Sequence, residues 1–258
     1  MLKLKGQGQV LWRFLPVVQF AFRLVGRGWN HFYGWMLDRQ EQRNTIHTIL
    51  KRAAKRQAPG KDMGLYDLSR GVYHADYLFR HGLKPAHRIL DIGCGFGRTG
   101  IPLIKRMDKG TYVGVELSAE RIRLAREWTA LEGLEPREPR WIVAFDNTLP
   151  YLADGEIDCV WAQSVLTHMP EDEIRVLLPA VRRVLKPGGT MLFNFTLSPD
   201  GSPHRSSVKD YQYPAALMTD LCRTLGFGVE VLDDWQDDLD PDSRALHNMM
   251  LKLRKADA

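Results

Sequence analysis

Short apolar runs alternate with segments of helical hydrophobic spacing along the chain after residue 65. Apolar runs bounded by turn residues predict buried strands, and the spaced segments predict amphipathic helices. Strands that alternate with helices form a mostly parallel sheet with helices on both faces. The pattern predicts strands at residues 88–91, 111–116, 141–146, 157–163, 190–195, 229–232 and 245–253, and helices at 65–82, 101–107, 118–131, 171–185 and 214–225.

A glycine-rich turn follows the first predicted strand and leads into the next helix. It runs from Gly93 to Gly100 and is preceded by Asp91. Gly95, Gly97 and Gly100 have the G-x-G-x-x-G spacing of a dinucleotide site, in which backbone N–H groups hold a pyrophosphate. A carboxylate just before the first glycine would repel a phosphate but would attract a cationic cofactor. The glycines alone leave both cofactor classes open.

Two further predicted strands also end in an acid. Glu116 ends the second strand, 25 residues after Asp91, where an acid suits the two hydroxyls of a ribose. Asp146 ends the third strand. Three acids around one glycine loop favour a ligand with a ribose, an adenine amine and a positive centre, and without phosphates. The sequence therefore predicts S-adenosylmethionine as the cofactor and S-adenosylhomocysteine as its product.

Five motifs lie in register along the predicted domain: Leu90-Asp-Ile-Gly-Cys-Gly-Phe-Gly97, Val113-Gly-Val-Glu116, Asp146, Asp158-Cys-Val-Trp161 and Leu185-Lys-Pro-Gly-Gly189. In order and spacing they resemble the class I S-adenosylmethionine-dependent methyltransferases, over about residues 65–253. The resemblance implies a Rossmann-like, seven-stranded, mostly parallel sheet whose last two strands pair as an antiparallel hairpin. The run Ser-Val-Leu-Thr-His-Met at residues 164–169 is similar to one that follows the fourth strand in a subgroup of small-molecule enzymes.

The resemblance also implies how the cofactor is held. Asp91 is expected near the methionine ammonium, Glu116 at the ribose hydroxyls and Asp146 at the adenine amine. Asp146 could instead cap the turn that follows it. Arg70 and Tyr73 are candidates for binding the methionine carboxylate. The other expected cofactor contacts are Gly93, Gly95, Gly97, Leu117, Asn147 and Gln163.

Candidate catalytic and acceptor-binding residues follow the fourth and fifth predicted strands. His168 has a side chain suited to taking a hydroxyl proton near neutrality, but its run also resembles a helix start, which would make it structural. His204, the second candidate base, lies in residues 197–213, a long polar connection that is either a substrate lid or a loop without a role. Ser164, Tyr211 and Tyr213 are the expected acceptor contacts. No Cys or His cluster has metal-ligand spacing, so no metal is expected.

Charge divides the chain near residue 61. The 258 residues include 36 Lys and Arg and 31 Asp and Glu, a formal net charge of +5. Residues 1–61 hold twelve of the basic residues and two of the acids, so the remainder is net acidic. We therefore expect a basic amphipathic helical extension at 1–61 and a catalytic domain at 62–258. The acidic domain argues against a nucleic-acid face, and three scattered cysteines predict a reducing, cytoplasmic setting.

The basic extension has several readings. Apolar residues recur at helical spacing from Val18 to Met36, with Arg23 and Arg27 on the other face. This pattern fits a helix packed on the domain or on a second subunit, or one lying on an anionic membrane surface. A nucleic-acid arm and a transit peptide are further alternatives. We expect self-association or a peripheral position on the inner face of a membrane.

The predicted function is methylation of an acceptor oxygen on a small-molecule, sugar or lipid-linked substrate, by in-line transfer. The resemblance associates an Asn/Asp-Pro-Pro-Tyr/Phe run with methylation of planar nitrogens, and no such run follows the fourth strand. Two alternatives stay open. One is an RNA-modifying methyltransferase that uses the basic arm, and the other is a non-catalytic module that binds S-adenosylmethionine.

Overall fold

The computed structural model describes residues 28–39, 69–108, 110–207, 209–235 and 248–256. These ranges include nearly all of the predicted domain and one part of the basic extension. Residues 1–27 and 40–61 of the extension lie outside the described residues.

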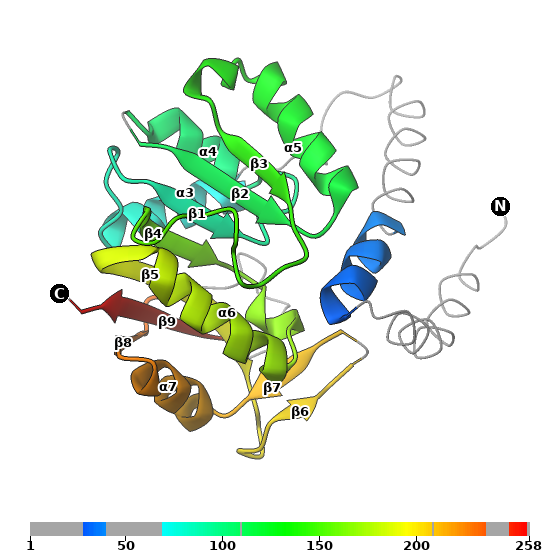
Figure 1. Ribbon diagram of the computed structural model, residues 1–258, viewed down its shortest axis with the longest axis vertical. Helices are drawn as coiled ribbons and strands as arrows, with labels where there is room; N and C mark the ends of the chain where they lie inside the picture. The colour runs from blue at the N-terminus through cyan, green and yellow to red at the C-terminus, as the bar shows by residue number, and fades with distance from the viewer. Residues whose placement is uncertain (1–27, 40–68, 109, 208, 236–247, 257–258) are drawn as a thin grey trace, which may run out of the picture.

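Seven strands of the described residues form the main sheet, in the order β3 (Arg140–Val143), β2 (Tyr112–Glu116), β1 (Ile89–Ile92), β4 (Ile157–Ala162), β5 (Leu185–Leu197), β9 (Asn248–Lys255) and β8 (Phe227–Leu232). The strands from β3 to β5 are parallel, and β9 is antiparallel to both of its neighbours (Figure 1). The predicted seven-stranded Rossmann-like sheet is confirmed, including its antiparallel last pair.

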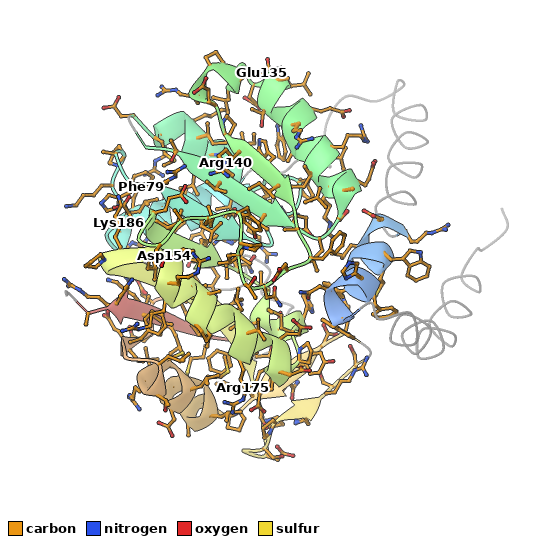
Figure 2. The ribbon with its side chains drawn as sticks, in the orientation of Figure 1. Phe79, Glu135, Arg140, Asp154, Arg175 and Lys186 are labelled. Atoms are coloured by element: carbon orange, nitrogen blue, oxygen red, sulfur yellow. The ribbon has the colours of Figure 1, made fainter. Side chains whose placement is uncertain are left out.

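Helices cover both faces of this sheet. One layer contains α3 (Ser69–Arg80), α4 (Gly100–Arg106) and α5 (Ala119–Leu131), and the other contains α6 (Glu171–Val184) and α7 (Ala215–Thr224). Successive side chains of a strand point to opposite faces, so Ile89 packs in the first layer and Leu90 in the second. Charged side chains such as Glu135 and Arg175 lie on the outside of the molecule (Figure 2).

Three segments differ from their predicted form. The third strand ends at Val143, so Asp146 lies in the loop after it and does not end the strand. The fifth strand begins at Leu185, directly after α6, because residues 186–189 continue beside β4 with a shift in register. Residues 198–213, predicted as a connection, contain a short hairpin of β6 (His204–Arg205) and β7 (Tyr211–Tyr213). β7 pairs with the end of β5, which places the hairpin beyond the carboxyl edge of the sheet.

The described part of the basic extension is a helix at residues 29–39, which lies at the carboxyl edge of the sheet (Figure 1). Asp38 Oδ1 accepts hydrogen bonds from the Ser118 hydroxyl (2.6 Å) and the Glu120 N–H (3.2 Å). Trp29 Nε1 donates to the carbonyl of His168 (3.1 Å). The apolar face is buried through Trp29, Phe32, Tyr33, Met36 and Leu37.

This helix therefore packs on the domain, which is one of the alternatives predicted for the extension. Its buried positions are not available to a membrane surface, so the membrane prediction now concerns residues 1–27, which lie outside the described residues. Within the described ranges, no helix combines the length and apolar character needed to cross a membrane.

Gly114 in β2 leaves no room for a side chain. A Cβ at this position would lie 2.8 Å from the ring of Trp141 and 2.9 Å from the sulfur of Cys94. The Trp141 ring cannot easily move, because its Nε1 donates to Thr129 Oγ1 (3.1 Å). By contrast, a Cβ at Gly228 in β8 would meet its nearest atom at 3.7 Å, an ordinary contact.

We expect Gly114→Ala to lower the free energy of unfolding by about 1–3 kcal/mol, because overpacking forces buried neighbours to shift. Gly228→Ala is the matched control, a second strand glycine with space for a methyl group, and should change it by less than about 0.5 kcal/mol. Urea unfolding of both variants measures the difference. Equal destabilisation would contradict the packing argument.

Candidate active site

A cavity of about 310 Å³ lies at the carboxyl edge of the parallel strands. The loops after β1, β2, β3 and β4 line it, together with the helix at residues 29–39 and Lys209 of the β6–β7 hairpin. Open parallel sheets bind ligands at this edge. Ten of the predicted site residues line the cavity: Asp91, Gly93, Gly95, Glu116, Leu117, Asp146, Asn147, Gln163, Ser164 and His168.

Two glycines of the loop after β1 differ in their surroundings: Gly93 lies close to a neighbouring side chain, whereas Gly95 borders open space in the cavity. Gly93 has φ +68°, and a Cβ there would lie 2.5 Å from a methyl group of Val165. Gly95 has φ +57°, and a Cβ there would have no atom within 4 Å, although the residue lines the cavity. Only glycine adopts these backbone conformations at little cost. Gly97 lies outside the lining, where its missing side chain makes room for the ring of Trp141.

Asp91 is almost fully buried at the end of β1 and has one hydrogen-bond donor. The Tyr112 hydroxyl donates to its Oδ2 at 2.6 Å. Burial raises the pKa of Asp91 to about 7, and the charge of Glu116 also raises it, while the hydrogen bond from Tyr112 opposes the shift. A cation bound in the cavity would favour the ionised carboxylate.

Glu116 is buried but well supplied with donors. Its Oε1 accepts from the N–H groups of Leu117 (2.7 Å) and Ser118 (3.2 Å), and its Oε2 accepts from the N–H of Gly95 (3.1 Å). Arg121 Nη1 lies 3.7 Å from Oε2. The carboxylate therefore ties the glycine loop to the end of β2 while it lines the cavity.

Asp146 caps the turn that follows it and also lines the cavity, where its contact with the adenine amine stays a prediction. Its Oδ1 accepts the N–H of Thr148 (2.8 Å), and hydrogen bonds from the side chain and the backbone of Thr148 lower the pKa of the carboxyl. Asn147 donates to Glu173 Oε2 (2.7 Å). The hydroxyl of Tyr151, which also lines the cavity, is buried and has no hydrogen-bond partner among the residues that the structure describes. An orphaned donor of this kind is satisfied when a polar ligand binds beside it.

At the α3 end of the cavity the structure corrects two predicted contacts. Arg70 and Tyr73 do not line the cavity, and the ring of Tyr73 packs in the apolar cluster beneath α3. His74 lines it instead, with Nδ1 2.9 Å from Thr99 Oγ1. Successive side chains on a helix point about 100° apart, so the neighbouring position faces the cavity. Burial lowers the pKa of His74 to about 3, with help from the charges of Arg70 and Arg98, so its imidazole is neutral.

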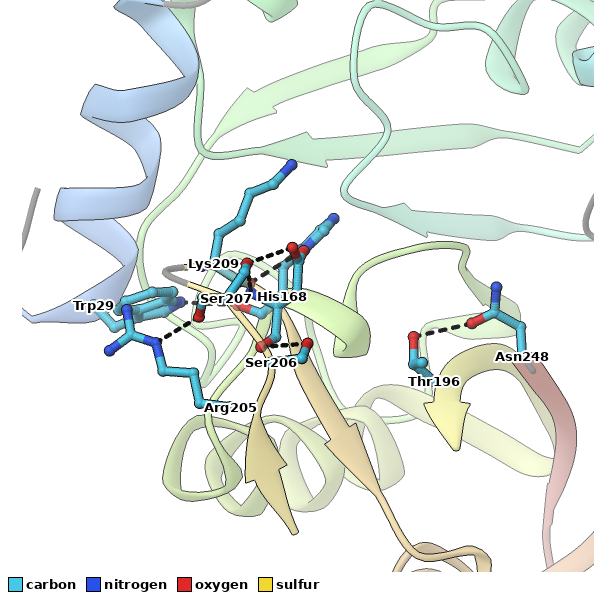
Figure 3. A network of polar contacts seen from close by, with 9 residues as sticks. Trp29, His168, Thr196, Arg205, Ser206, Ser207, Lys209 and Asn248 are labelled. Atoms are coloured by element: carbon cyan, nitrogen blue, oxygen red, sulfur yellow. Dashed lines mark hydrogen bonds and ion pairs between the residues drawn. The ribbon is translucent and has the colours of Figure 1, made fainter. Parts of the chain in front are cut away.

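His168 lines the cavity and is held by the hairpin (Figure 3). Its Nδ1 lies 2.9 Å from Asp210 Oδ1 and 3.3 Å from the carbonyl of Lys209. The hydrogen bond with His168 lowers the pKa of Asp210 to about 2, against the effect of burial. Because Nδ1 is held as a donor, Nε2 carries the free lone pair of the neutral ring.

The structure does not bring His204 to the cavity. His204 lies on the outer part of the hairpin, where its Nδ1 is 3.4 Å from the Ser202 carbonyl and 3.7 Å from Asp200. Its prediction as a catalytic base is therefore not supported, because a base must reach the proton that it removes.

Tyr211 and Tyr213 also lie outside the cavity lining. Tyr213 is buried, and its hydroxyl donates to the carbonyl of Met169 (2.6 Å). The ring of Tyr211 meets that of Trp29 edge-on, with centroids 5.8 Å apart. Of the three predicted acceptor contacts, only Ser164 lines the cavity, and the two tyrosines join the hairpin to its neighbours.

The turn after β4 is held in an uncommon backbone conformation. Ser164 has φ +54°, and its N–H donates to Asn194 Oδ1 at 2.6 Å. Gln163 Nε2 donates to the Ser164 hydroxyl at 2.6 Å. Non-glycine residues in this region of backbone space cost energy and concentrate at functional sites.

Sequence reasoning missed a group of lining residues, most of them from segments far apart in the chain: Trp29, Asn30, Tyr33, Leu37, His74, Arg98, Arg121, Tyr151 and Lys209. The helical spacing up to Met36 does predict the helix, but it does not say which surface the helix covers. Asp210 lies within the segment flagged as a lid, yet nothing in the sequence pairs it with His168.

A family model described as "Methyltransferase domain" matches residues 89–189. Methyltransferase GfsG of Streptomyces halstedii is 34% identical over 116 residues, which cover 43% of this chain and 38% of that protein. The 27-O-demethylrifamycin SV methyltransferase of Amycolatopsis mediterranei is 32% identical, covering 60% of this chain and 52% of that protein. The chain thus spans about half the length of these curated relatives.

Solved structures share the fold at low identity. Magnesium protoporphyrin IX methyltransferase (ChlM) from Synechocystis, solved with bound SAM, has a TM-score of 0.56 at 15% identity and covers 81% of this chain and 92% of its own. The [4+2]-cyclase SpnF has a TM-score of 0.60 at 19% identity, covering 72% of this chain and 82% of its own. Residues 89–189 thus match a methyltransferase domain, and the fold around them is shared with solved S-adenosylmethionine-dependent methyltransferases.

Proposed function

We propose that the protein transfers a methyl group from S-adenosylmethionine to a hydroxyl oxygen of a small-molecule acceptor. The observation that carries the choice of oxygen is the His168–Asp210 pair on the cavity wall. The relatives are named as O-, N- and C-methyltransferases, so they support methyl transfer without selecting the acceptor atom. A hydroxyl must lose a proton when it is methylated, and a histidine fixed at Nδ1 is a suitable base.

The residues present fit the cofactor. Glu116 would hold the ribose hydroxyls, Asp146 and Tyr151 the adenine end, and Asp91 the ammonium. The open space at Gly95 and the unpartnered hydroxyl of Tyr151 support this assignment. When bound, S-adenosylmethionine supplies an electrophilic methyl carbon, whose bond to sulfur breaks with its electron pair left on sulfur as the acceptor oxygen forms the new bond.

The remaining work falls to the protein's own side chains. His168 Nε2 would take the hydroxyl proton, and Asp210 would keep the ring oriented and stabilise the imidazolium that results. Val165, Met169 and Leu177 line the cavity with apolar surface, which limits the access of water to the acceptor oxygen. The protein thus contributes mainly alignment and proton removal.

A small acceptor is favoured by the shape of the site. A cavity of about 310 Å³, which the cofactor would share with the acceptor, lies at the lower end of the range for small-molecule pockets. The helix at residues 29–39 closes it on one side, and a nucleic-acid duplex would not fit beneath that helix. A sugar or lipid-linked acceptor remains within the proposal if its reacting end is small. A membrane or self-association role for the extension likewise stays a proposal, and it concerns residues outside the described ranges.

The test of the function is transfer of labelled methyl from S-adenosylmethionine to a small-molecule cell extract, with the product's methylated atom identified by NMR. A new methoxy group is the expected product. Label found only in RNA, or only on nitrogen or carbon, would overturn the assignment to a hydroxyl.

Glu116→Gln should weaken S-adenosylmethionine binding by about tenfold to a hundredfold, because charge-assisted hydrogen bonds contribute about 1.5–3 kcal/mol. Isothermal titration calorimetry measures the dissociation constant. Glu127→Gln is the control, since Glu127 pairs with Arg123 on the exposed face of α5. Unchanged affinity in a folded Glu116→Gln variant would mean that the ribose assignment is wrong.

Cofactor affinity should rise with pH up to about 7 and then level off. The pKa of Asp91 is raised to about 7 in the free protein by burial, so binding an ammonium at lower pH must first release the Asp91 proton. Calorimetry in buffers of different ionisation enthalpy detects that proton. Asp91→Asn should bind more weakly and lose this proton release. Release that persists in Asp91→Asn would assign it to another group.

His168→Ala should slow methyl transfer by about a hundredfold or more and leave the dissociation constant for the cofactor unchanged. Asp210→Asn should slow it by at least about tenfold, because Asp210 orients the ring and stabilises the imidazolium that results from proton transfer. Asp200→Asn, next to His204, is the control. An unchanged rate in a folded Asp210→Asn variant would mean that Asp210 does not support the base.

A further inference from the structure

Lys209 places a positive charge on the cavity wall beside His168. Its carbonyl lies 3.3 Å from His168 Nδ1, and its own N–H donates to the Ser207 hydroxyl at 3.2 Å. Its ammonium makes no hydrogen bond or ion pair within the part of the chain that the structure describes. Figure 3 shows the Lys209 and His168 side chains extending to the same side of the hairpin. The backbone is thus fixed, while the charge is left for a ligand.

The neighbouring carboxylates are already occupied. Asp210, the next residue, is bound to His168 and accepts a hydrogen bond from the Ser207 hydroxyl (2.5 Å). Glu116 accepts three backbone N–H groups and lies 3.7 Å from Arg121, so one lining cation already has an acidic partner. The Lys209 ammonium has no such acidic partner within hydrogen-bond or ion-pair distance among the described residues.

The other groups at this end of the cavity suit a compact ligand. Trp29 and Tyr33 present aromatic surface from the helix at residues 29–39, and their rings stack with centroids 5.8 Å apart. The Tyr33 ring lies 5.6 Å from that of His168. A ligand between these groups meets an apolar wall, a base and a cation together. A partly enclosed cation binds an anion more strongly than an exposed one, because the surrounding dielectric is lower.

We propose that the acceptor is an organic anion, in which one hydroxyl faces His168 and a carboxylate or phosphate binds Lys209. Lys209 is then a residue that determines acceptor specificity, and His168 remains the base. This inference rests on the proposed function, since it names the substrate class of the same site. It does not depend on which of the two anionic groups the acceptor carries.

The experiment separates a small-molecule cell extract on an anion-exchange column before the reaction. The retained and flow-through pools are each incubated with labelled S-adenosylmethionine and the full-length protein, and phosphatase treatment of the retained pool distinguishes phosphate esters from carboxylic acids. We expect label in the retained pool. Lys209→Met should reduce that labelling by about tenfold to a hundredfold, through a higher KM and with the cofactor dissociation constant unchanged.

Two variants serve as controls. Lys209→Arg keeps the positive charge and should retain most of the labelling. Lys105→Met removes a lysine that pairs with Glu132 away from the cavity, and should behave as the unmodified protein does.

The outcomes separate the two proposals. Label only in the flow-through pool, or equal labelling by Lys209→Met, overturns the anionic acceptor and leaves methyl transfer intact. No label in either pool, from protein that binds the cofactor in calorimetry, overturns the proposed function and this inference with it.

Discussion

The end of the cavity proposed to hold the methyl donor, which we call the donor end, depends on the parallel pairing of β1 with both β2 and β4. In that arrangement the three strands end at one edge of the sheet, where Asp91 of β1 and Glu116 of β2 line the cavity. The N–H of Gly93 donates to the carbonyl of Val115 at 2.8 Å, and Glu116 then accepts the N–H of Gly95. Strand pairing and one carboxylate therefore hold the start of the glycine loop.

The same arrangement places two carboxylates of unequal character side by side. Glu116 has three backbone donors, whereas Asp91 has the single hydroxyl of Tyr112 and almost no contact with solvent. The charge of Glu116 adds to the effect of burial in raising the pKa of Asp91. A ligand cation relieves both effects at once. Burial of Asp91 thus lowers the stability of the free protein, and a positively charged ligand offsets this loss.

Most residues proposed to hold the cofactor could be placed in the cavity from the sequence, whereas most of those proposed around the acceptor could not. The reason is physical. Strands β1 and β2 are buried on both faces, so their apolar runs and the acids that end them can be read directly. His168 and Asp210 are 42 positions apart and meet only because β7 pairs with the end of β5. Helical spacing alone gives no reference for which face of α3 meets the cavity, so the prediction names Tyr73 and misses His74. The sequence around a residue does not indicate which side chains from distant segments will pack against it.

The division between the cofactor and acceptor ends of the cavity follows the boundaries of the region that the methyltransferase domain model matches. Residues 89–189 include the glycine loop, Glu116, Asp146 and His168, but they end before the hairpin and begin after the helix at residues 29–39. Trp29, Tyr33 and the hairpin around β7 therefore form the wall that the shared domain leaves open. The relatives are named as O-, N- and C-methyltransferases. The acceptor differs, and the segments outside the shared domain are free to differ with it. In this chain they bring one lysine and one aspartate to the single histidine that the shared domain contributes.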